Sequence, residues 1–527
     1  MKAEPPKVIM PGKKYLDKQK KVKQTKSPPW GNIKDVLDQK PQNVAGDATY
    51  LSVFFAYLWL VPNLIVGLLV GTSSLGFITM ASWAEVAVSL GRPLYCAPIM
   101  WWWIIGGMLA FILKNKASRL KLFMWEQASF GNGDWWYHGE GIWCHTWEMC
   151  HKITRDYQDR KSAFACLRVP TPDVFARKIL IFLSCDQPHS SEWAVTRRAL
   201  KRELLGNSIK DGEYQKRCDK LPDKLKEWGY HGAGKEKLLD IDYLNIGVVR
   251  CIFFVLFGKD LVNEEDATVL TGWRTNAGFF VFPRFVQRFL FNIGVRKIRS
   301  LREKQAAIIE SYGLKEPFRR IAEDLAEAGY PSPSSVEVMD RIMYAIGFAG
   351  IGGTCAALES TGAMINGKLT KGVSEELVEI PDVDMVKLYA SNAVNFIKEV
   401  CRLDPPVTSA TSVLKEEVTI PWPTGKSGCG KASTRTFPAG TLNQYVISMA
   451  NRDEQVFKDP KKFDPSRPDL DSALTWNGAW SSAQRWSPGA REDEDKYPRI
   501  CPGRYLSVTV VKAIVDACLE VTSEGML

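Results

Sequence analysis

The sequence predicts a mainly α-helical domain with a small β region, preceded by a basic arm and an apolar membrane segment. Two mostly apolar stretches, residues 242–257 and 506–519, have the length and composition of buried helices. Residues 300–328 are rich in charge and predict a mostly exposed helix with breaks. Residues 419–442, with their prolines and glycines, predict strands joined by turns.

The first 46 residues form a basic arm. Residues 1–26 contain nine lysines and only two acidic residues, Glu4 and Asp17. Such an arm is usually solvated and disordered, although it can also contact anionic lipid headgroups. We expect no nucleic-acid partner, because aromatic residues are not interleaved with the basic ones. The arm is too polar and too long for a cleavable secretory signal, and a plastid transit peptide remains an alternative.

Residues 47–121 contain two candidate transmembrane helices. No charged residue occurs at positions 48–84, and a second uncharged run covers 93–113, with three tryptophans near its middle. About 20 apolar residues span a bilayer, and tryptophan favours its interface. Basic residues flank both outer sides, so the positive-inside rule predicts a hairpin with the arm and the following domain, residues 122–527, in the cytosol. A monotopic apolar patch is the alternative, and the endoplasmic reticulum and a plastid membrane are not distinguished.

The segment from Tyr497 to Arg504 carries the most specific chemistry. It places Cys501 in an Arg-x-Cys-x-Gly frame just before the predicted helix at 506–519. A cysteine thiolate that binds haem iron needs a tight loop and a helix leading away from it. Gly503 supplies backbone freedom, and the helix N-terminus helps to stabilise the thiolate. Cys-Pro-Gly also occurs in ordinary turns, so this motif alone is weak.

Two further segments occur upstream in a fixed order. Glu399 and Arg402 lie at i and i+3 of a helix that two prolines end, so they share one face. An exposed pair of this kind would stabilise little. The second segment runs from an Asn-Arg-Asp triplet through Phe457 to a Phe-x-Pro-x-Arg sequence that ends at Arg467.

Together these motifs resemble the C-terminal half of a cytochrome P450. The resemblance covers roughly residues 145–527 and implies the P450 fold with haem b (iron protoporphyrin IX) as cofactor. It implies that Cys501 is the axial ligand of the haem iron. It also implies that Glu399, Arg402 and Arg467 form a buried structural element behind the haem.

A Trp-x-x-x-Arg pair lies further upstream. Trp193 and Arg197 are one helical turn apart and share a face. In the family these residues bond a haem propionate, as an arginine at the position of Arg499 often does. The resemblance therefore implies that Trp193, Arg197 and Arg499 are cofactor-binding residues.

The helix that would cross the haem distinguishes branches of the family. Oxygen-activating members usually carry an acid and a threonine there, whereas this chain has Gly352 and Gly353, with Thr354 one position along. The segment is more similar to the Phe-Asn-x-Phe-Gly-Gly frame of allene oxide synthases and hydroperoxide lyases. A Trp-Asn-Gly segment at 476–478 and the altered cysteine loop favour the same branch. Ala349 stands where that branch carries asparagine, which leaves lyase or epoxyalcohol synthase outcomes open.

The resemblance thus implies an enzyme that rearranges or cleaves polyunsaturated fatty-acid hydroperoxides at a membrane without a reductase, with Cys501, Gly353 and Thr354 at the reacting centre. Such a substrate already carries its O–O bond, and a thiolate ligand favours cleavage of that bond. One alternative is a reductase-dependent lipid or sterol monooxygenase, for which Thr354 is the favouring feature. Another is a haem-binding protein without turnover. Close packing of the glycines over the porphyrin is a purely structural alternative for 350–353.

A zinc site is a less favoured interpretation of one cysteine- and histidine-rich segment. Cys144, His145, Cys150 and His151 are ligand types for zinc, but adjacent ligands do not easily close one tetrahedron. Scattered cysteines more often indicate buried, reduced thiols.

Overall fold

The computed structural model describes part of the chain. The described residues are 28–37, 135–138, 141–144, 146–156, 191–205, 212–276, 292–330, 334–370, 377–407, 410–413, 417–422, 433–439, 442–479, 497, 499–522 and 525–526. The predicted membrane segment, with its hairpin, and most of the basic arm lie outside the described residues.

Within these residues the fold is mainly helical. The helices are α2 (Ile33–Leu37), α7 (Trp147–Asp156), α9 (Glu192–Leu204), α10 (Glu213–Asp219), α11 (Leu221–Glu227), η3 (Lys235–Leu239), α12 (Ile241–Phe257), α13 (Glu264–Asn276), α15 (Asn292–Ser311), α16 (Lys315–Glu327), α17 (Ser335–Ala345), η5 (Ile346–Ile351), α18 (Gly352–Ile365), α19 (Met385–Ser391), α20 (Ala393–Leu403), α21 (Ile447–Ala450), η7 (Leu470–Ser472) and α23 (Arg504–Leu519). The two apolar stretches of the sequence are helices α12 and α23, as expected.

The strands form three small sheets. They are β1 (Trp135–His138), β2 (Gly141–Cys144), β3 (Ala410–Val413), β4 (Val418–Trp422), β5 (Ser433–Phe437), β6 (Leu442–Tyr445), β7 (Val521–Thr522) and β8 (Gly525–Met526). The largest sheet has the order β1-β2-β6-β3, in which only the β2–β6 pair is parallel. Strands β4 and β5 pair antiparallel, which agrees with the strand-and-turn prediction for 419–442.

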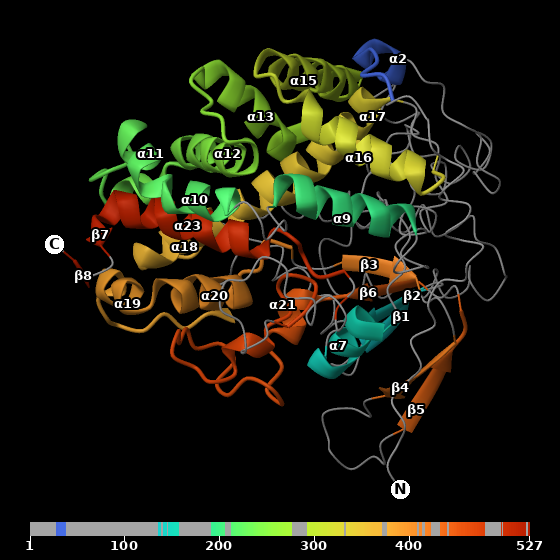
Figure 1. Cartoon of the computed structure of the whole chain (residues 1–527). Coiled ribbons are helices and arrows are strands. Elements are labelled where there is room, and N and C mark those ends of the chain that lie inside the picture. The colour runs from blue at the N-terminus through green and yellow to red at the C-terminus, as the bar shows by residue number, and fades with distance from the viewer. Residues whose placement is uncertain are drawn as a thin grey trace, which may run out of the picture.

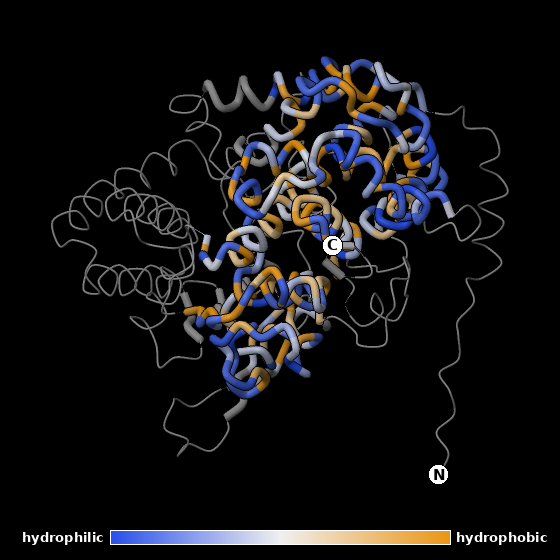
Figure 2. The backbone as a smooth tube through the Cα atoms, turned by 90° about the vertical axis from the view of Figure 1, so that its left-hand side faces the viewer, coloured by the Kyte–Doolittle hydropathy of each residue, from blue (hydrophilic) through white to orange (hydrophobic). Residues whose placement is uncertain are grey.

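The hydrophobic core lies where α12, α18, α20 and α23 meet (Figure 1). Helix α12 is buried along most of its length, and its ends follow from local chemistry. The Asp240 side chain accepts a hydrogen bond from the backbone N–H of Tyr243, which caps the start of the helix. Gly258 ends it in the left-handed conformation that favours glycine. Hydrophobic segments gather where the described helices meet, and hydrophilic ones follow their outer turns (Figure 2).

Residues 300–328 differ from the exposed helix that their charge predicts. The segment breaks at Gly313, between α15 and α16, and one side of each helix is buried. Arg302 is itself buried and forms a two-pronged ion pair with Asp340 of α17, with Nη2 2.7 Å from Oδ2. A high charge content therefore does not exclude burial when each charge has a partner.

One continuous helical segment, residues 335–365, crosses the interior as α17, η5 and α18. Its middle part, η5, has the wider π-helical winding, which often marks functional positions in helices. Among the described residues this is the one helix long and apolar enough to cross a membrane, but 56% of the relevant stretch is buried inside the protein. Its hydrophobicity is thus that of a core helix.

The N-terminal residues 28–37 dock on the helical domain. Trp30 donates from its indole nitrogen to Glu310 Oε1 at 2.6 Å, and its carbonyl accepts from the backbone N–H of Val336 at 2.7 Å. Gly31 has φ +84, and a Cβ there would lie 2.7 Å from Ser334. Residues 28–37 therefore pack on the same folded body as α15 and α17.

A second, smaller hydrophobic cluster joins α7 to the sheets. It contains eight buried residues, namely Met149, Cys150, Val418, Phe437, Tyr445, Ile447, Ala450 and Leu474.

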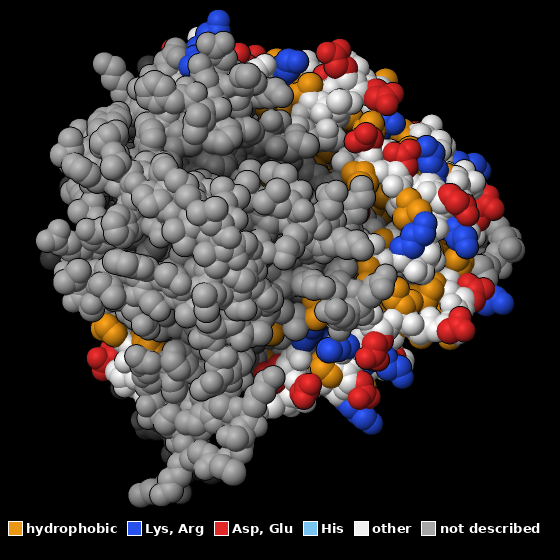
Figure 3. Space-filling view, turned by 180° about the vertical axis from the view of Figure 1, so that it is seen from behind, with side chains coloured by type: hydrophobic (Ala, Val, Ile, Leu, Met, Phe, Trp, Pro, Cys, Tyr) orange, Lys and Arg blue, Asp and Glu red, His pale blue; other side chains and the backbone are white. Residues whose placement is uncertain are grey.

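On the back of the molecule, the described surface mixes acidic and basic side chains over the helices (Figure 3).

Candidate functional site: the cysteine loop and the helix across the core

The loop that carries Cys501 is fixed from two sides. The backbone N–H of Cys501 donates to the carbonyl of Trp476 at 2.8 Å, which ties the loop to the 475–478 turn. Arg197 of α9 donates from Nη2 to the carbonyl of Ile500. Helix α23 begins directly after the loop, with Gly503 at its N-cap position. Cys501 thus lies at a helix N-terminus, as the sequence predicts.

Opposing influences act on the Cys501 thiol. Burial raises its pKa above the usual range, while the Gly503 N–H and the charges of Arg197 and Arg504 act in the opposite direction. These three groups favour the thiolate, which is the form that binds metals.

The three residues predicted to hold a cofactor converge beside Cys501. Trp193, Arg197 and Arg499 are all buried. Both guanidinium groups lie over the Trp193 ring, with Cζ of Arg197 5.3 Å and Cζ of Arg499 4.8 Å from its centroid. Two buried guanidinium groups and an indole form a donor set that suits carboxylates next to a thiolate. The residues present therefore fit a haem, whose two propionates need such donors.

Arg504 is a member of this cluster to which the sequence analysis gave no role. It is buried, and its Nη1 donates to the carbonyl of Cys501 at 3.0 Å. In the sequence, Arg504 follows the Cys-Pro pair by two residues, and this position is the feature that could have indicated its role. The arginine reaches back over one helical turn, so it constrains the loop as well as adding positive charge.

Behind the cysteine loop, Glu399 and Arg402 form a fully buried ion pair on α20. Arg402 donates from Nε and Nη2 to the two carboxylate oxygens at 2.7 and 2.8 Å. Arg467 donates from Nε to Glu399 Oε1 at 3.1 Å, and the backbone N–H of Asp464 does so at the same distance. The structure thus brings together all three residues that the motif order singled out.

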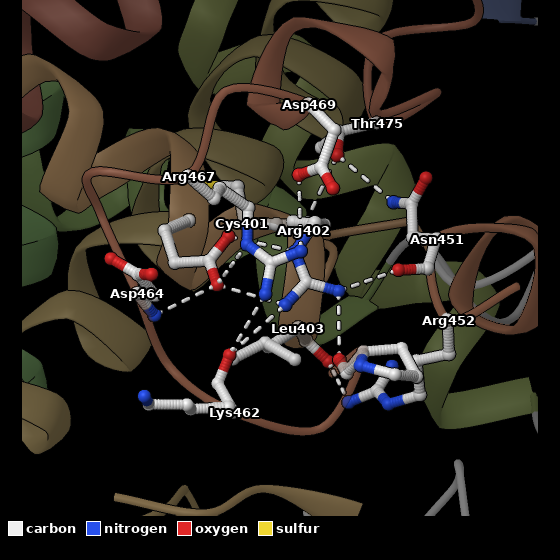
Figure 4. A network of polar contacts seen from close by, with 12 residues as sticks. Cys401, Arg402, Leu403, Asn451, Arg452, Lys462, Asp464, Arg467, Asp469 and Thr475 are labelled. Carbon is white, nitrogen blue, oxygen red and sulfur yellow. Dashed lines mark hydrogen bonds and ion pairs between the residues drawn. The ribbon is translucent and has the colours of Figure 1, made fainter. Parts of the chain in front are cut away.

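The remaining donors of the two arginines are used by backbone carbonyls and by the Asp469 carboxylate, which accepts from Arg467 Nη1 at 3.1 Å (Figure 4). Arg402 Nη1 donates to the carbonyls of Asn451 and Pro460, at 2.7 and 2.9 Å. Arg467 Nη2 donates to the carbonyl of Lys462 at 3.2 Å. Phe457 lies under both guanidinium groups, 5.1 Å from Cζ of Arg402 and 5.9 Å from Cζ of Arg467. The network therefore fixes the meander at 451–467 against α20.

A third buried arginine, Arg452, supports the same region. Burial lowers its pKa, with the nearby Arg402 charge acting in the same direction. Its guanidinium donates to three backbone carbonyls, those of Leu377, Ser448 and Leu403. Arg452 belongs to the Asn-Arg-Asp triplet of the motif, but nothing in the sequence indicates that it is buried.

Between Phe348 and Thr354 the otherwise buried helix reaches the surface, where Phe348 and Ala349 are exposed and Gly352 and Gly353 are half-buried. Phe348 is 41% exposed and its ring stacks on Tyr344, with centroids 5.7 Å apart. A Cβ at Gly353 would meet nothing within 4 Å beyond its own helical backbone, so protein packing does not require glycine there. Close packing over a porphyrin, the structural alternative for 350–353, stays a prediction.

Thr354 points to α23. It is buried, and its hydroxyl donates to Ser507 Oγ at 3.0 Å. Its part in proton transfer stays a prediction, as do the roles of Gly353 and Cys501. The bond nevertheless links the helix across the core to the helix that begins at the cysteine loop.

The alternative zinc site lies only partly within the described residues. Among the described residues no group of three or more His, Cys, Asp or Glu side chains is arranged to hold a metal ion. His145 lies outside the described residues, Cys150 is buried, and His151 Nε2 shares a hydrogen bond with the Tyr497 hydroxyl.

The comparison with family models agrees with the motif order. Residues 392–520 match the family model described as cytochrome P450. Among solved structures, the chain is similar to Mycobacterium smegmatis CYP164A2 with econazole bound (TM-score 0.48, 15% identity, covering 78% of this chain and 92% of that chain). It is also similar to ligand-free cytochrome P450 TbtJ1 (TM-score 0.48, 14% identity, 76% and 89%). A third similar structure is P450BioI in complex with acyl carrier protein ligated with hexadec-9Z-enoic acid (TM-score 0.47, 13% identity, 72% and 85%). No curated protein matches the sequence.

Proposed function

From the premise that residues 392–520 are those of a cytochrome P450, we propose that this haem-thiolate enzyme rearranges or cleaves fatty-acid hydroperoxides without a reductase. The observation that carries the proposal is the glycine-rich patch at 348–354. It presents no acid, and its only alcohol, Thr354, is hydrogen-bonded to Ser507. Reductive activation of dioxygen needs delivered protons, whereas a hydroperoxide brings its O–O bond with it.

The residues around Cys501 would hold haem b. Cys501 would be the axial ligand, and Trp193, Arg197 and Arg499 would hold the propionates. A bound haem with a thiolate ligand supplies electron density that favours O–O cleavage. The chain itself contributes the Gly503 N–H and the buried arginines, which act against the effect of burial and favour the thiolate form.

The part of the core helix at 348–354 would bind the lipid. Phe348 offers an exposed aromatic face, and Gly352 and Gly353 leave room beside it. Apolar chains bind where apolar surface is already exposed, because burial of both surfaces is favourable. The described residues here are poor in proton donors, which suits a radical that rearranges within the site.

We further propose that residues 47–121 attach the enzyme to a membrane, with residues 122–527 on the cytosolic side. Fatty-acid hydroperoxides partition into bilayers, so a site at the membrane surface shortens the path of the substrate. The docking of Trp30 on Glu310 and Val336 supports this topology, because it holds residues 28–37 on the same body as the domain after the apolar segment.

The test uses the haem-loaded full-length protein and a polyunsaturated fatty-acid hydroperoxide. No reductase and no nicotinamide cofactor are added, and the loss of conjugated-diene absorbance is followed. We expect rapid loss that disappears in Cys501→Ser and persists in Cys518→Ser, which alters a buried cysteine near the far end of α23. An intact thiolate spectrum without turnover would instead favour a reductase-dependent monooxygenase or a haem protein without turnover. Product analysis separates lyase, dehydratase and epoxyalcohol outcomes.

A further inference from the structure

The cysteine loop has a third attachment, which comes from α7. Tyr497, four residues before Cys501, is buried, and its hydroxyl lies 2.8 Å from Nε2 of His151. The two rings also meet edge to face, with centroids 5.6 Å apart. The pair joins residues that are 346 positions apart in the sequence. It thus connects the loop to a helix that the motif analysis did not link to it.

The His151 ring is itself held in place. It stacks on Trp147, with centroids 4.3 Å apart and planes inclined by 12°. Trp147 donates from its indole nitrogen to the carbonyl of Ser472 and from its backbone N–H to Asp453 Oδ2, each at 2.7 Å. Because two hydrogen bonds hold Trp147, its stacking fixes the His151 ring and directs Nε2 at the Tyr497 hydroxyl. A positioning contact requires such a fixed direction.

The turn that contains Gly478 packs directly against the ring of Tyr497. A Cβ on Gly478 would lie 2.6 Å from Cγ of Tyr497, a distance at which one of the two groups must move. Two residues earlier, the Trp476 carbonyl accepts from the Cys501 N–H. The Tyr497 carbonyl accepts from the Ile500 N–H at 2.9 Å, which closes the turn between tyrosine and cysteine. The ring, the turn and the sulfur are therefore consecutive parts of one hydrogen-bonded unit.

We propose that His151 and Tyr497 are positioning residues for the Cys501 thiolate. Their hydrogen bond fixes the start of the turn, so that at its other end the Gly503 N–H stays directed at the sulfur. The inference rests on the haem-thiolate part of the proposed function and is independent of the hydroperoxide chemistry. A purely stabilising aromatic pair is the competing explanation, and it makes a different spectroscopic prediction.

The test compares three haem-loaded full-length variants. Tyr497→Phe removes only the hydroxyl, and His151→Gln removes the imidazole ring together with the stacking on Trp147 that directs Nε2. Tyr389→Phe is the matched control, because Tyr389 is also fully buried and its hydroxyl donates to Asp516 Oδ1 at 2.9 Å, on a part of α23 remote from Cys501. Each protein is chemically reduced and exposed to carbon monoxide. The difference spectrum then gives the ratio of thiol-ligated to thiolate-ligated haem.

We expect this ratio to rise about fivefold in Tyr497→Phe and in His151→Gln, the equilibrium factor of one typical hydrogen bond. The double variant should change no more than either single one, because both remove the same bond. Tyr389→Phe should lower the melting temperature and leave the ratio unchanged. As a second route, Gly478→Ala displaces the tyrosine ring and should raise the ratio in the same direction.

Two results would overturn the inference. An unchanged ratio in both Tyr497→Phe and His151→Gln, with a melting-temperature loss like that of Tyr389→Phe, would make the pair stabilising only. Unequal effects that add in the double variant would show that the two residues do not act through their shared bond. If the unaltered protein itself shows no thiolate spectrum, the haem-thiolate proposal fails, and this outcome is distinct from the other two.

Discussion

Replacing Glu399 with glutamine would place two buried arginines around a neutral amide. The carboxylate accepts from Arg402 Nε and Nη2, from Arg467 Nε and from the Asp464 N–H, and its side chain is 0% exposed. A glutamine keeps the shape but turns an N–H₂ group toward one guanidinium, so a donor faces a donor. Breaking a buried ion pair costs about 3–5 kcal/mol, and we expect a loss of stability in that range.

The assay is equilibrium unfolding in urea, followed by far-ultraviolet circular dichroism. Glu316→Gln is the matched control, since it removes the same charge from an exposed pair with Arg320, in which the side chains are 60% and 55% exposed. That pair should contribute at most about 0.5 kcal/mol. Equal losses from Glu399→Gln and Glu316→Gln would refute the argument that burial makes the Glu399 network costly to break.

Three further outcomes are expected. Burial raises the pKa of Cys218 to about 11, whereas an unfolded thiol titrates near ~8.5. Between the pKa of the unfolded thiol and that of the folded one, the folded state keeps a proton that the unfolded state loses. The free energy of unfolding therefore falls as the pH rises through this range, by up to ~3 kcal/mol. Cys218→Ala should flatten this slope in urea titrations, and an unchanged slope would contradict the assignment. Trp30→Phe loses the bond to Glu310 and should cost about 1 kcal/mol, with faster proteolysis within 28–37. Equal proteolysis rates would show that the segment is not held by this bond. Gly353→Ala adds a Cβ that meets nothing within 4 Å and should raise stability by up to ~1 kcal/mol. A lower melting temperature would mean that the position is already filled.

Spacing along a helix was enough to predict part of the site. Because i and i+3 residues share a face, the Glu399–Arg402 pair follows from the sequence alone, as does the shared face of Trp193 and Arg197. The order of the motifs made Cys501 and Arg467 candidate site residues from the sequence alone. What spacing does not contain is burial, and burial decides whether the Glu399 pair is a weak surface contact or part of the core.

Charge content was a poorer guide than motif order. Residues 300–328 read as exposed, yet Arg302 is buried against Asp340, a partner 38 residues away that no local pattern reveals. The same holds for Arg452, whose buried guanidinium is satisfied by backbone carbonyls from three segments. Polar residues become core residues when the tertiary structure supplies their partners.

The sequence by itself determined the helical character of the domain and its family-level motifs, because each of these depends on residue type and on short, regular spacing. Only the tertiary structure decided that His151 of α7 meets Tyr497, that Thr354 bonds Ser507, and that residues 28–37 dock on α15 and α17. These contacts join segments roughly 150 to 350 positions apart. Their partners are selected by the shape and burial of the folded chain, for which neighbouring residues carry no signal.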